Sequence, residues 1–257
     1  MTDLSNKVAL VTAGGAGIGA ATASAFARQG AAVMVADIDQ HNGEAVVEQL
    51  RKAGAKAQFF HADATREENI ERMVRTTVES FGGLHIAANI VGYAHPEAIG
   101  PDFHLQSELG WDQTFVVSLR SVFLSMKHEI AHMIEHGGGV ICNVTSLAGM
   151  THVPESGAAY GVAKAGVIRL TKFAAMNYAD RGVRVNCIAP GTTPTDAYQK
   201  AGPEVAEQLI NRLIQQQAIK RPIDTSEQAE AIRWLCSDAA AMVTGHVLPV
   251  DGGWSAR

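Results

Sequence analysis

The sequence contains little of what marks a secreted or membrane-spanning protein. Among its 257 residues only Cys142, Cys187 and Cys236 are cysteines, an odd number at wide spacing, which argues against a disulfide framework and indicates reduced core residues. No uninterrupted apolar run reaches the length of a membrane span, and residues 1–7 lack the basic and apolar regions of a signal peptide. We therefore expect a cytoplasmic protein that does not interact with a membrane.

An excess of positive charge is missing as well. The net charge is -5 at pH 7, the pI is near 6.0, and the charged residues are scattered rather than grouped in blocks. Such a chain offers no basic surface to a nucleic-acid backbone, so we expect a small-molecule partner and no nucleic acid. No linker-like stretch or shift in composition divides the sequence, which predicts a single domain over residues 1–257.

The chain does have a regular alternation of strand-like and helical segments. This alternation predicts an α/β fold, a single doubly wound Rossmann domain in which about seven parallel strands carry helices on both faces. The expected strands are 7–12, 32–37, 57–61, 84–89, 140–145, 183–189 and 246–250. The expected helices are 18–29, 43–53, 67–81, 107–135, 159–178 and 227–237, and a shorter one at 204–217 belongs to an expected substrate lid within 192–219.

A glycine-rich turn follows the first expected strand. Its glycines are Gly14, Gly15, Gly17 and Gly19, with Ile18 opening the next helix. Free backbone N–H groups and the helix dipole at such a turn favour a pyrophosphate, and glycines let it approach closely. The alternative is a tight strand-to-helix connection without a ligand, but the strand–helix alternation favours a nucleotide.

Acidic residues end the second and third expected strands. Asp37 follows the glycines by about 20 residues, where a carboxylate accepts hydrogen bonds from an adenosine ribose and repels a 2′-phosphate. Asp39 lies closer to the next helix and is the better candidate for its cap, so we interpret Asp37 as a ligand of NAD. Thr65 and Glu68 form a capping-box pattern, which leaves Asp63 to meet the adenine.

Three further residues carry the expected chemistry. Tyr160 and Lys164 are four residues apart, so they lie on one face of a helix and an ammonium can sit beside a phenol. A neighbouring positive charge favours the phenolate, and we expect the pKa of Tyr160 to fall from its usual value near ~10 toward a range useful for acid–base catalysis. Ser146 would hold the substrate oxygen, with Thr145 as a weaker substitute.

Together these motifs resemble those of the short-chain dehydrogenase/reductase family, almost from end to end. The turn Thr12 to Gly19 resembles the family's Thr-Gly-x-x-x-Gly-x-Gly, residues 89–92 resemble its Asn-Asn-Ala-Gly, and Ser146 with Tyr160 and Lys164 matches its Ser and Tyr-x-x-x-Lys. Residues 186–191 resemble its Pro-Gly segment beside the nicotinamide, and residues 244–253 its C-terminal strand.

The resemblance implies an NAD-dependent alcohol dehydrogenase or ketone reductase with Tyr160 as general acid/base. The implied catalytic residues are Ser146, Tyr160, Lys164 and Ser118. The cofactor-binding residues are Gly14, Gly15, Gly17, Ile18, Asp37, Asp63, Ala64, Asn89, Gly92, Tyr160, Lys164, Pro190, Gly191, Thr193 and Thr195. Relatives usually form tetramers through the helices expected at 107–135 and 159–178, so a homotetramer is implied as well.

Three places depart from the family pattern. Ala13 replaces the first glycine, and its methyl fits if the turn keeps a negative φ there. Ile90 and Val91 replace an asparagine and an alanine, which affects local packing. Ser118 replaces the asparagine of the proton relay. If the backbone carbonyl at this position holds the relay water, a serine suffices. If the relay needs the asparagine side-chain amide, proton transfer to solvent is slower.

A competing motif points to another chemistry. His128, Glu129 and His132 form the His-Glu-x-x-His of zinc proteases, and His136 follows one turn later. The buried stripe of this helix is Met126, Ile130, Met133 and Ile134, which would leave the histidines on a polar face toward solvent or a subunit contact. We therefore expect no metal site. A zinc hydrolase and a catalytically silent NAD-binding scaffold remain the alternatives, although a scaffold would not explain Ser146, Tyr160 and Lys164 together.

The substrate is indicated only by its surroundings. Leu147, Met150, Val153 and Tyr198 follow the catalytic or nicotinamide-side segments and would give an apolar pocket, narrowed by the insertion 93–109. This favours a cyclic or aromatic-bearing secondary alcohol or its ketone. His95 and His152 fall in loops that either overhang the substrate or lie at the surface.

Overall fold

One parallel sheet forms the centre of the molecule. The structure is a computed structural model that describes residues 3–99, 102–153, 156–195, 198 and 202–256. Its strands are β1 (Val8–Thr12), β2 (Ala32–Asp37), β3 (Ala57–His61), β4 (Ile86–Asn89), β5 (Gly139–Val144), β6 (Val183–Pro190) and β7 (Val247–Val250). They are ordered β3-β2-β1-β4-β5-β6-β7, and every neighbouring pair is parallel. The expected doubly wound fold is confirmed.

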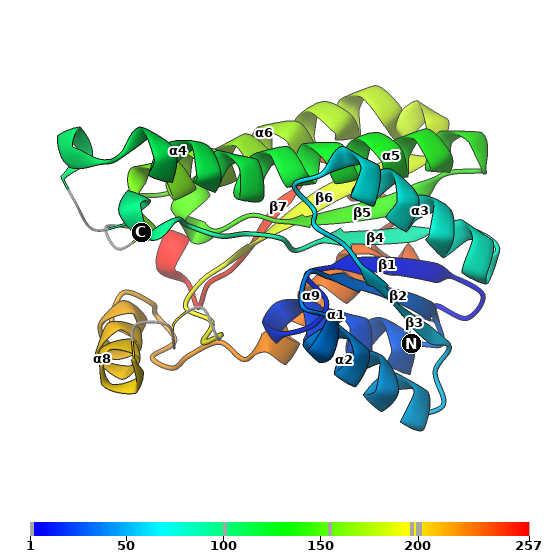
Figure 1. Cartoon of the computed structure of the whole chain (residues 1–257), viewed down its shortest axis with the longest axis horizontal. Helices are drawn as coiled ribbons and strands as arrows, with labels where there is room; N and C mark the ends of the chain where they lie inside the picture. Colours follow the sequence, from blue (N-terminus) through cyan, green and yellow to red (C-terminus); the bar gives the residue numbers. More distant parts are fainter. Residues whose placement is uncertain (1–2, 100–101, 154–155, 196–197, 199–201, 257) are drawn as a thin grey trace.

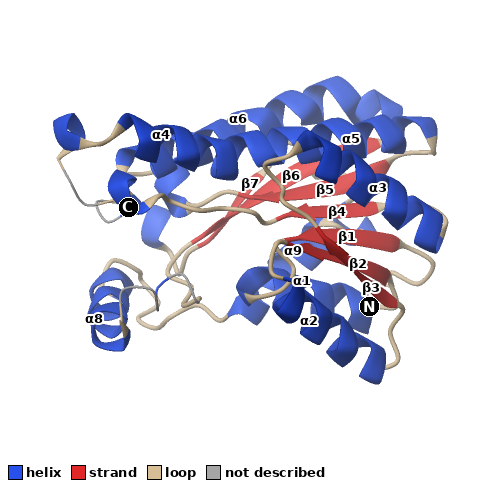
Figure 2. Cartoon of the chain, viewed as in Figure 1, coloured by secondary structure: helices blue, strands red, loops and turns tan. Residues whose placement is uncertain are grey.

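Helices cover both faces of this sheet (Figures 1 and 2). On one face lie α3 (Glu67–Phe81), α4 (Glu108–Phe115), α5 (Ser121–Glu135) and α6 (Ala158–Tyr178); on the other lie α1 (Gly17–Arg28), α2 (Gln40–Lys52) and α9 (Thr225–Leu235). Helix α8 (Pro203–Ile214) stands apart from both layers, beyond the carboxyl ends of the strands (Figure 1).

The strands bury side chains on both faces, as a covered parallel sheet requires. On β1, Val11 packs into the cluster that includes Phe26 of α1 and Leu235 of α9. Leu10, the next residue along, faces the other way and packs with Met73 of α3. This alternation explains why the strands read in the sequence as nearly continuous apolar runs.

The sheet reverses its winding between β1 and β4, which creates a crevice at the carboxyl ends of these two strands. The side chain of Thr12 spans it: its Oγ1 accepts from Ile90 N at 3.1 Å and donates to Ala88 O at 3.4 Å. The segment after β4 is thereby fixed to the end of β1, and the site is built around this point.

Three local expectations are corrected by the structure. The helix expected at 107–135 contains a π-helical turn, Val116–Arg120, between α4 and α5. The helix expected at 43–53 begins at Gln40, because Asp39 caps it through Asn42 N at 3.0 Å. The predicted capping box of α3 is absent: its N-cap is Arg66 without a side-chain bond, while Thr65 N and Oγ1 donate to Asp63 Oδ1 at 2.9 and 2.7 Å.

The cysteines behave as expected. Cys142, Cys187 and Cys236 are free and buried. Within the described residues, no helix combines the length and the apolar character needed to cross a membrane.

Candidate active site

A cavity of about 620 Å³ opens at the carboxyl ends of the strands. It brings together most of the residues that the motifs predicted. Those that line it are Gly17, Ile18, Asp37, Gly92, Ser146, Tyr160, Lys164, Pro190, Gly191, Thr193 and Thr195. These residues come from segments spread over nearly 180 positions of the chain, so the fold assembles one site from them.

The other predicted site residues do not line the cavity: Gly14, Gly15, Asp63, Ala64, Asn89 and Ser118. Gly15 belongs to the glycine-rich turn, and its N–H donates to Asp37 Oδ2 at 2.8 Å. The carboxylate of Asp63 accepts from Thr65, and the Asn89 amide turns into the helix layer toward Glu129. The assignment of the first five of these residues as cofactor ligands, and of Ser118 as a catalytic residue, therefore stays a prediction.

The glycine-rich turn is folded tightly onto the start of α1. A Cβ on Gly19 would lie 1.9 Å from the carbonyl oxygen of Ala13, and one on Gly15 would lie 2.9 Å from Asp37 Oδ2. Ala13 itself has a φ of 50°, in the left-handed region that disfavours a side chain by about 1–2 kcal/mol. The condition under which its methyl was expected to fit, a negative φ, is therefore not met, and Ala13 adopts a conformation that glycine tolerates better.

Asp37 is held in place from two sides. Oδ2 accepts from Gly15 N, and Oδ1 accepts from Asp39 N at 2.9 Å. Two backbone donors therefore orient a carboxylate at the end of β2, on the edge of the cavity. As predicted, Asp39 rather than Asp37 caps α2.

Small residues let the segment after β5 approach α6. Ser146 precedes the short 3-10 turn Leu147–Gly149, and its Oγ accepts from Ala148 N at 3.2 Å. A Cβ on Gly149 would lie 2.7 Å from the carbonyl carbon of Lys164, and one on Gly161 would lie 3.0 Å from Ala148 O. With glycine at both positions the turn packs against α6, and Ser146 reaches a hydrogen bond with Tyr160.

Lys164 is buried and directed toward two strand ends. Its Nζ donates to Val144 O at 2.9 Å and to Val91 O at 3.2 Å. A Cβ on Gly92 would lie 2.7 Å from this Nζ, so glycine leaves room for the ammonium. The same Nζ lies 5.7 Å from the centroid of the Tyr160 ring.

The acid–base behaviour of Tyr160 differs from the expectation. Burial of the phenol raises its pKa from 10.0 to about 12, and the hydrogen bond with Ser146 offsets only part of this rise. Burial also lowers the pKa of Lys164 to about 8. The predicted lowering of the Tyr160 pKa is thus wrong for the ligand-free protein, because burial of the phenol, with a smaller contribution from Tyr198, outweighs the hydrogen bond with Ser146.

Ser118 performs a different local task from the expected one. It lies in the π-helical turn and is fully buried. Its Oγ donates to Tyr93 O at 2.7 Å and accepts from Tyr93 N at 2.8 Å. The hydroxyl therefore fixes the segment after β4, and the water on the backbone carbonyl of Ser118 stays a prediction.

Some predicted substrate contacts are also displaced. Thr145 lines the cavity, but its hydroxyl donates to Lys164 O at 2.7 Å and so does not substitute for Ser146. Met150 is exposed and, like His95 and His152, is not among the lining residues. Leu147, Val153 and Tyr198 line it as expected.

Several lining residues were not predicted. Apolar ones among them are Ile90, Ala94, Ile99, Leu209, Leu213 and Trp254. Trp254 comes from the end of the chain, where the Asp251 carboxylate accepts from Gly253 N at 2.9 Å and Ser255 N at 2.7 Å. The Asp-Gly-Gly sequence was a turn signal, but nothing local showed that the turn would reach the site.

Leu209 and Leu213 place α8 at the cavity, as a lid requires. Residues 196–197 and 199–201 of the expected lid lie outside the described residues.

Two glutamines that the sequence did not single out hold the segment after β6. Gln217 accepts from Thr192 N at 3.1 Å and donates to Arg221 O at 2.8 Å. Gln228 on α9 donates to Thr193 Oγ1 at 3.0 Å and to Val250 O at 2.9 Å. The segment after β6 is therefore connected to both α9 and the chain that follows α8.

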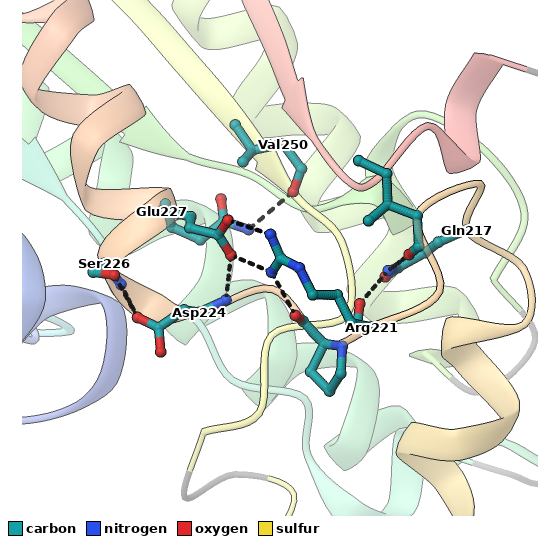
Figure 3. A network of polar contacts seen from close by, with 9 residues as sticks. Gln217, Arg221, Asp224, Ser226, Glu227 and Val250 are labelled. Atoms are coloured by element: carbon teal, nitrogen blue, oxygen red, sulfur yellow. Dashed lines mark hydrogen bonds and ion pairs between the residues drawn. The ribbon is translucent and has the colours of Figure 1, made fainter.

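An ion pair fixes the start of α9 beside these glutamines. Figure 3 shows Arg221 reaching Glu227, with nitrogen–oxygen distances of 2.7 and 2.6 Å, while Asp224 caps the helix through Ser226 N. The pKa of Glu227 is lowered to about 2, chiefly by the hydrogen bond from Arg221. The segment between α8 and α9 is thereby attached to the start of α9.

The His-Glu-x-x-His residues point in different directions. His128 faces α3, with its Nε2 3.2 Å from Glu67 Oε1, and His132 is partly buried and stacked on His136 with ring centroids 4.0 Å apart. Glu129 faces the opposite way and is fully buried. The histidines were expected on a polar face toward solvent or a subunit contact; His136 is exposed and His132 partly buried, whereas the expectation was wrong for His128, which contacts Glu67 of α3. Among the described residues, no group of three or more His, Cys, Asp or Glu side chains is placed to hold a metal ion.

Comparison with known proteins agrees with this geometry. A family model described as enoyl-(acyl carrier protein) reductase matches residues 12–255. The chain belongs to the short-chain dehydrogenase/reductase family.

A 2,5-dichloro-2,5-cyclohexadiene-1,4-diol dehydrogenase of Sphingobium indicum is 41% identical over 100% of both chains. The cyclohexanol dehydrogenase of Acinetobacter sp. is 35% identical, over 98% of this chain and 96% of that one. The structure of a levodione reductase superposes with a TM-score of 0.92 at 31% identity, covering 98% of each chain. The protein is therefore an oxidoreductase, and its family typically binds a nicotinamide cofactor.

Proposed function

We propose that the protein transfers a hydride between NAD and a cyclic or aromatic-bearing secondary alcohol or ketone. The observation that carries this proposal is the meeting of Ser146, Tyr160 and Lys164 in one cavity whose far edge holds Asp37. A cavity with an acid–base group at one end and a ribose ligand at the other suits a dinucleotide and a small substrate side by side.

The residues present fit a nicotinamide cofactor. Gly17 and Ile18 begin α1 at the cavity, where helix N–H groups favour a pyrophosphate. Thr192 lines the cavity, and its buried Oγ1 has no partner within the described chain, so a hydroxyl is available there. Gly92 leaves the Lys164 ammonium accessible, since a side chain would occupy its position.

Asp37 supports NAD rather than NADP. Its carboxylate is fixed by Gly15 N and Asp39 N, so it would keep its position against a ribose hydroxyl and repel a 2′-phosphate. At position 16 the chain has an exposed alanine, which offers no cation to pair with a phosphate.

The chain's own residues would handle the oxygen and the proton. Ser146 Oγ orients the substrate oxygen, and Tyr160 Oη donates a proton to a carbonyl or accepts one from an alcohol. Lys164 would hydrogen-bond the nicotinamide ribose, and its positive charge would favour the phenolate form of Tyr160. When bound in its oxidised form, the cofactor supplies the hydride acceptor and a positive charge near the phenol. Ser118 would contribute a backbone carbonyl for a relay water.

The substrate end of the cavity is apolar. Its side chains include Ala94, Ile99, Leu147, Val153, Leu209, Leu213 and Trp254. Such walls stabilise an uncharged carbon skeleton by removing apolar surface from water. The names of the two relatives described above, both dehydrogenases of six-membered carbocycles, support a cyclic alcohol here.

We also propose that the protein is a homotetramer. Phe123 of α5 and Phe173 and Met176 of α6 are exposed on the helix layer, the last with 83% of its surface accessible. Apolar side chains gathered on neighbouring helices mark an association surface.

A panel of cyclic, aromatic, steroid and sugar alcohols assayed with NAD tests the proposal through the absorbance of the reduced cofactor. We expect turnover of cyclic secondary alcohols. The alternative of a catalytically silent NAD-binding scaffold predicts NAD binding without turnover of any alcohol or ketone. A zinc hydrolase would instead show stoichiometric metal and sensitivity to chelators.

A further inference from the structure

A carboxylic acid lies buried in the helix layer behind the site. Glu129 of α5 has 0% of its surface exposed. The amide of Asn89 donates to Glu129 Oε2 at 2.9 Å and to Asn143 Oδ1 at 3.1 Å. Asn143 in turn donates to Thr171 Oγ1 of α6 at 2.9 Å. The four side chains form one buried polar cluster, here called the Glu129 cluster.

The Glu129 cluster joins the ends of the two strands that carry the site. Asn89 is the last residue of β4 and pairs in register with Asn143 near the end of β5. Gly92 follows the first by three residues and Ser146 follows the second by three residues. The relative position of β4 and β5 at this edge also sets the two carbonyls, Val91 O and Val144 O, that hold Lys164.

The surroundings of the carboxyl favour its protonated form. Glu129 Oε1 and Asn89 Oδ1 are both buried acceptors without a partner within the described chain, so a negative charge there would be poorly solvated. Burial raises the pKa of Glu129 to about 7, and the hydrogen bond from Asn89 opposes this only in part.

Among the residues that the structure describes, no charged side chain on the packed elements compensates the carboxyl. β4, β5 and α6 present Asn89, Asn143 and Thr171, all neutral. On β6 the Cys187 thiol contacts Thr171, and burial raises its pKa to about 12, so it stays neutral. On α3, Glu67 pairs with Lys127 and His128, on the other side of α5. On α6, the Lys164 ammonium donates to the strand carbonyls instead.

We propose that Glu129 is a positioning residue: its neutral carboxyl holds the Asn89 amide in the hydrogen bond that joins the ends of β4 and β5, and its ionisation loosens the edge that carries Gly92 and Ser146. The catalytic part of this inference rests on the proposed function, whereas the stability part does not. Because the pKa is raised in the fold, this contribution to stability is complete below about pH 4.5 and is lost as the pH rises to about 7.

The test compares the wild type with Glu129→Gln, which keeps the shape and cannot ionise, and with Glu135→Gln, an exposed glutamate on the same helix. Thermal melts from pH 5 to pH 9 need no substrate. We expect Glu129→Gln to match the wild type near pH 5 and to melt at a higher temperature above pH 7, while Glu135→Gln follows the wild type throughout. If Glu129→Gln does not fold, Glu129→Met removes the charge at similar volume and takes its place.

The second measurement follows kcat/KM and the NAD dissociation constant over the same range. We expect the ratio of kcat/KM for Glu129→Gln over wild type to rise from about one at pH 6 to about threefold or more at pH 8.5, where the wild-type carboxyl is mostly ionised. Identical melting profiles of both proteins would overturn the proposal. Divergent melts with parallel pH profiles of kcat/KM and NAD binding would reduce Glu129 to a purely structural role. Absence of any turnover, with NAD affinity still diverging above pH 7, would contradict the proposed function and leave the positioning role supported.

Discussion

The tightest contact of the glycine-rich turn gives a prediction of defined size. In Gly19→Ala the new Cβ would lie 1.9 Å from Ala13 O, 2.7 Å from Ala13 C and 2.9 Å from Gly14 Cα. All three atoms belong to the backbone, so no side-chain rotation relieves the clash and the turn must move by about 1 Å, since contacts under about 3 Å are repulsive. Overpacking of this kind costs about 1–3 kcal/mol, against about 1 kcal/mol that alanine gains over glycine within a helix.

We therefore expect Gly19→Ala to melt up to about 8 °C below the wild type, at about 2–4 °C per kcal/mol for a chain of this size. Because the displaced turn is the proposed pyrophosphate site, the NAD dissociation constant should rise at least about tenfold, which corresponds to about 1.4 kcal/mol. Calorimetry with NAD and a thermal melt measure the two effects.

Gly54→Ala is the matched control. Gly54 has a φ of 88°, but a Cβ there would meet nothing within 4 Å, and the residue lies outside the cavity. It should lower the melting temperature through its backbone conformation alone and leave NAD binding unchanged. If Gly19→Ala bound NAD as tightly as the wild type, the turn would not be the phosphate site and this reasoning would fail.

Three further predictions concern the cavity. Tyr160→Phe should abolish turnover while calorimetry still detects NAD binding, because it removes the proton carrier and leaves the glycine-rich turn intact; near-normal turnover would refute the acid–base assignment. Asp37→Ala should weaken NAD binding and raise the efficiency with NADP relative to NAD, measured as the ratio of kcat/KM values, since the fixed carboxylate is removed; an unchanged ratio would exclude Asp37 as the selector. Ser118→Ala should reduce kcat by about tenfold or less, far less than Lys164→Ala, and should lower stability by about 1–3 kcal/mol in denaturant melts, because two buried hydrogen bonds to Tyr93 are lost. Loss of activity as complete as in Tyr160→Phe, in a folded protein that binds NAD, would instead place the Ser118 hydroxyl in the proton path.

The elements of the fold were predictable because burial on two faces leaves a strong signal in the sequence. A strand such as Ala32–Asp37 is apolar along nearly its whole length, and its observed bounds match the predicted ones. The π-helical turn at Val116–Arg120 was not predictable, since the apolar period continues through it. The positive φ of Ala13 was not predictable from the residue itself, because alanine favours a negative φ.

In the site, spacing predicted which residues meet but not how each side chain is used. Tyr160 and Lys164 share a helix face and Ser146 reaches them, as the motif indicated. Leu213 and Trp254 line the cavity because segments distant in the sequence fold back to it, and no local sequence pattern predicts this. The hydrogen-bond partner of a hydroxyl, such as the backbone carbonyl that accepts from Thr145, is likewise set by packing.

The protonation state of Tyr160 shows why packing matters for mechanism. With a pKa of about 12 the ligand-free phenol is neutral near pH 7, so it is ready to donate a proton to a carbonyl. In the opposite direction it must first lose that proton, which requires a positive charge closer than Lys164 Nζ, 5.7 Å from the ring centroid. In the proposed mechanism the ligand-free site would therefore hold Tyr160 in its acid form, and alcohol oxidation would depend on a positive charge in the loaded cavity rather than on the Tyr-Lys pair alone.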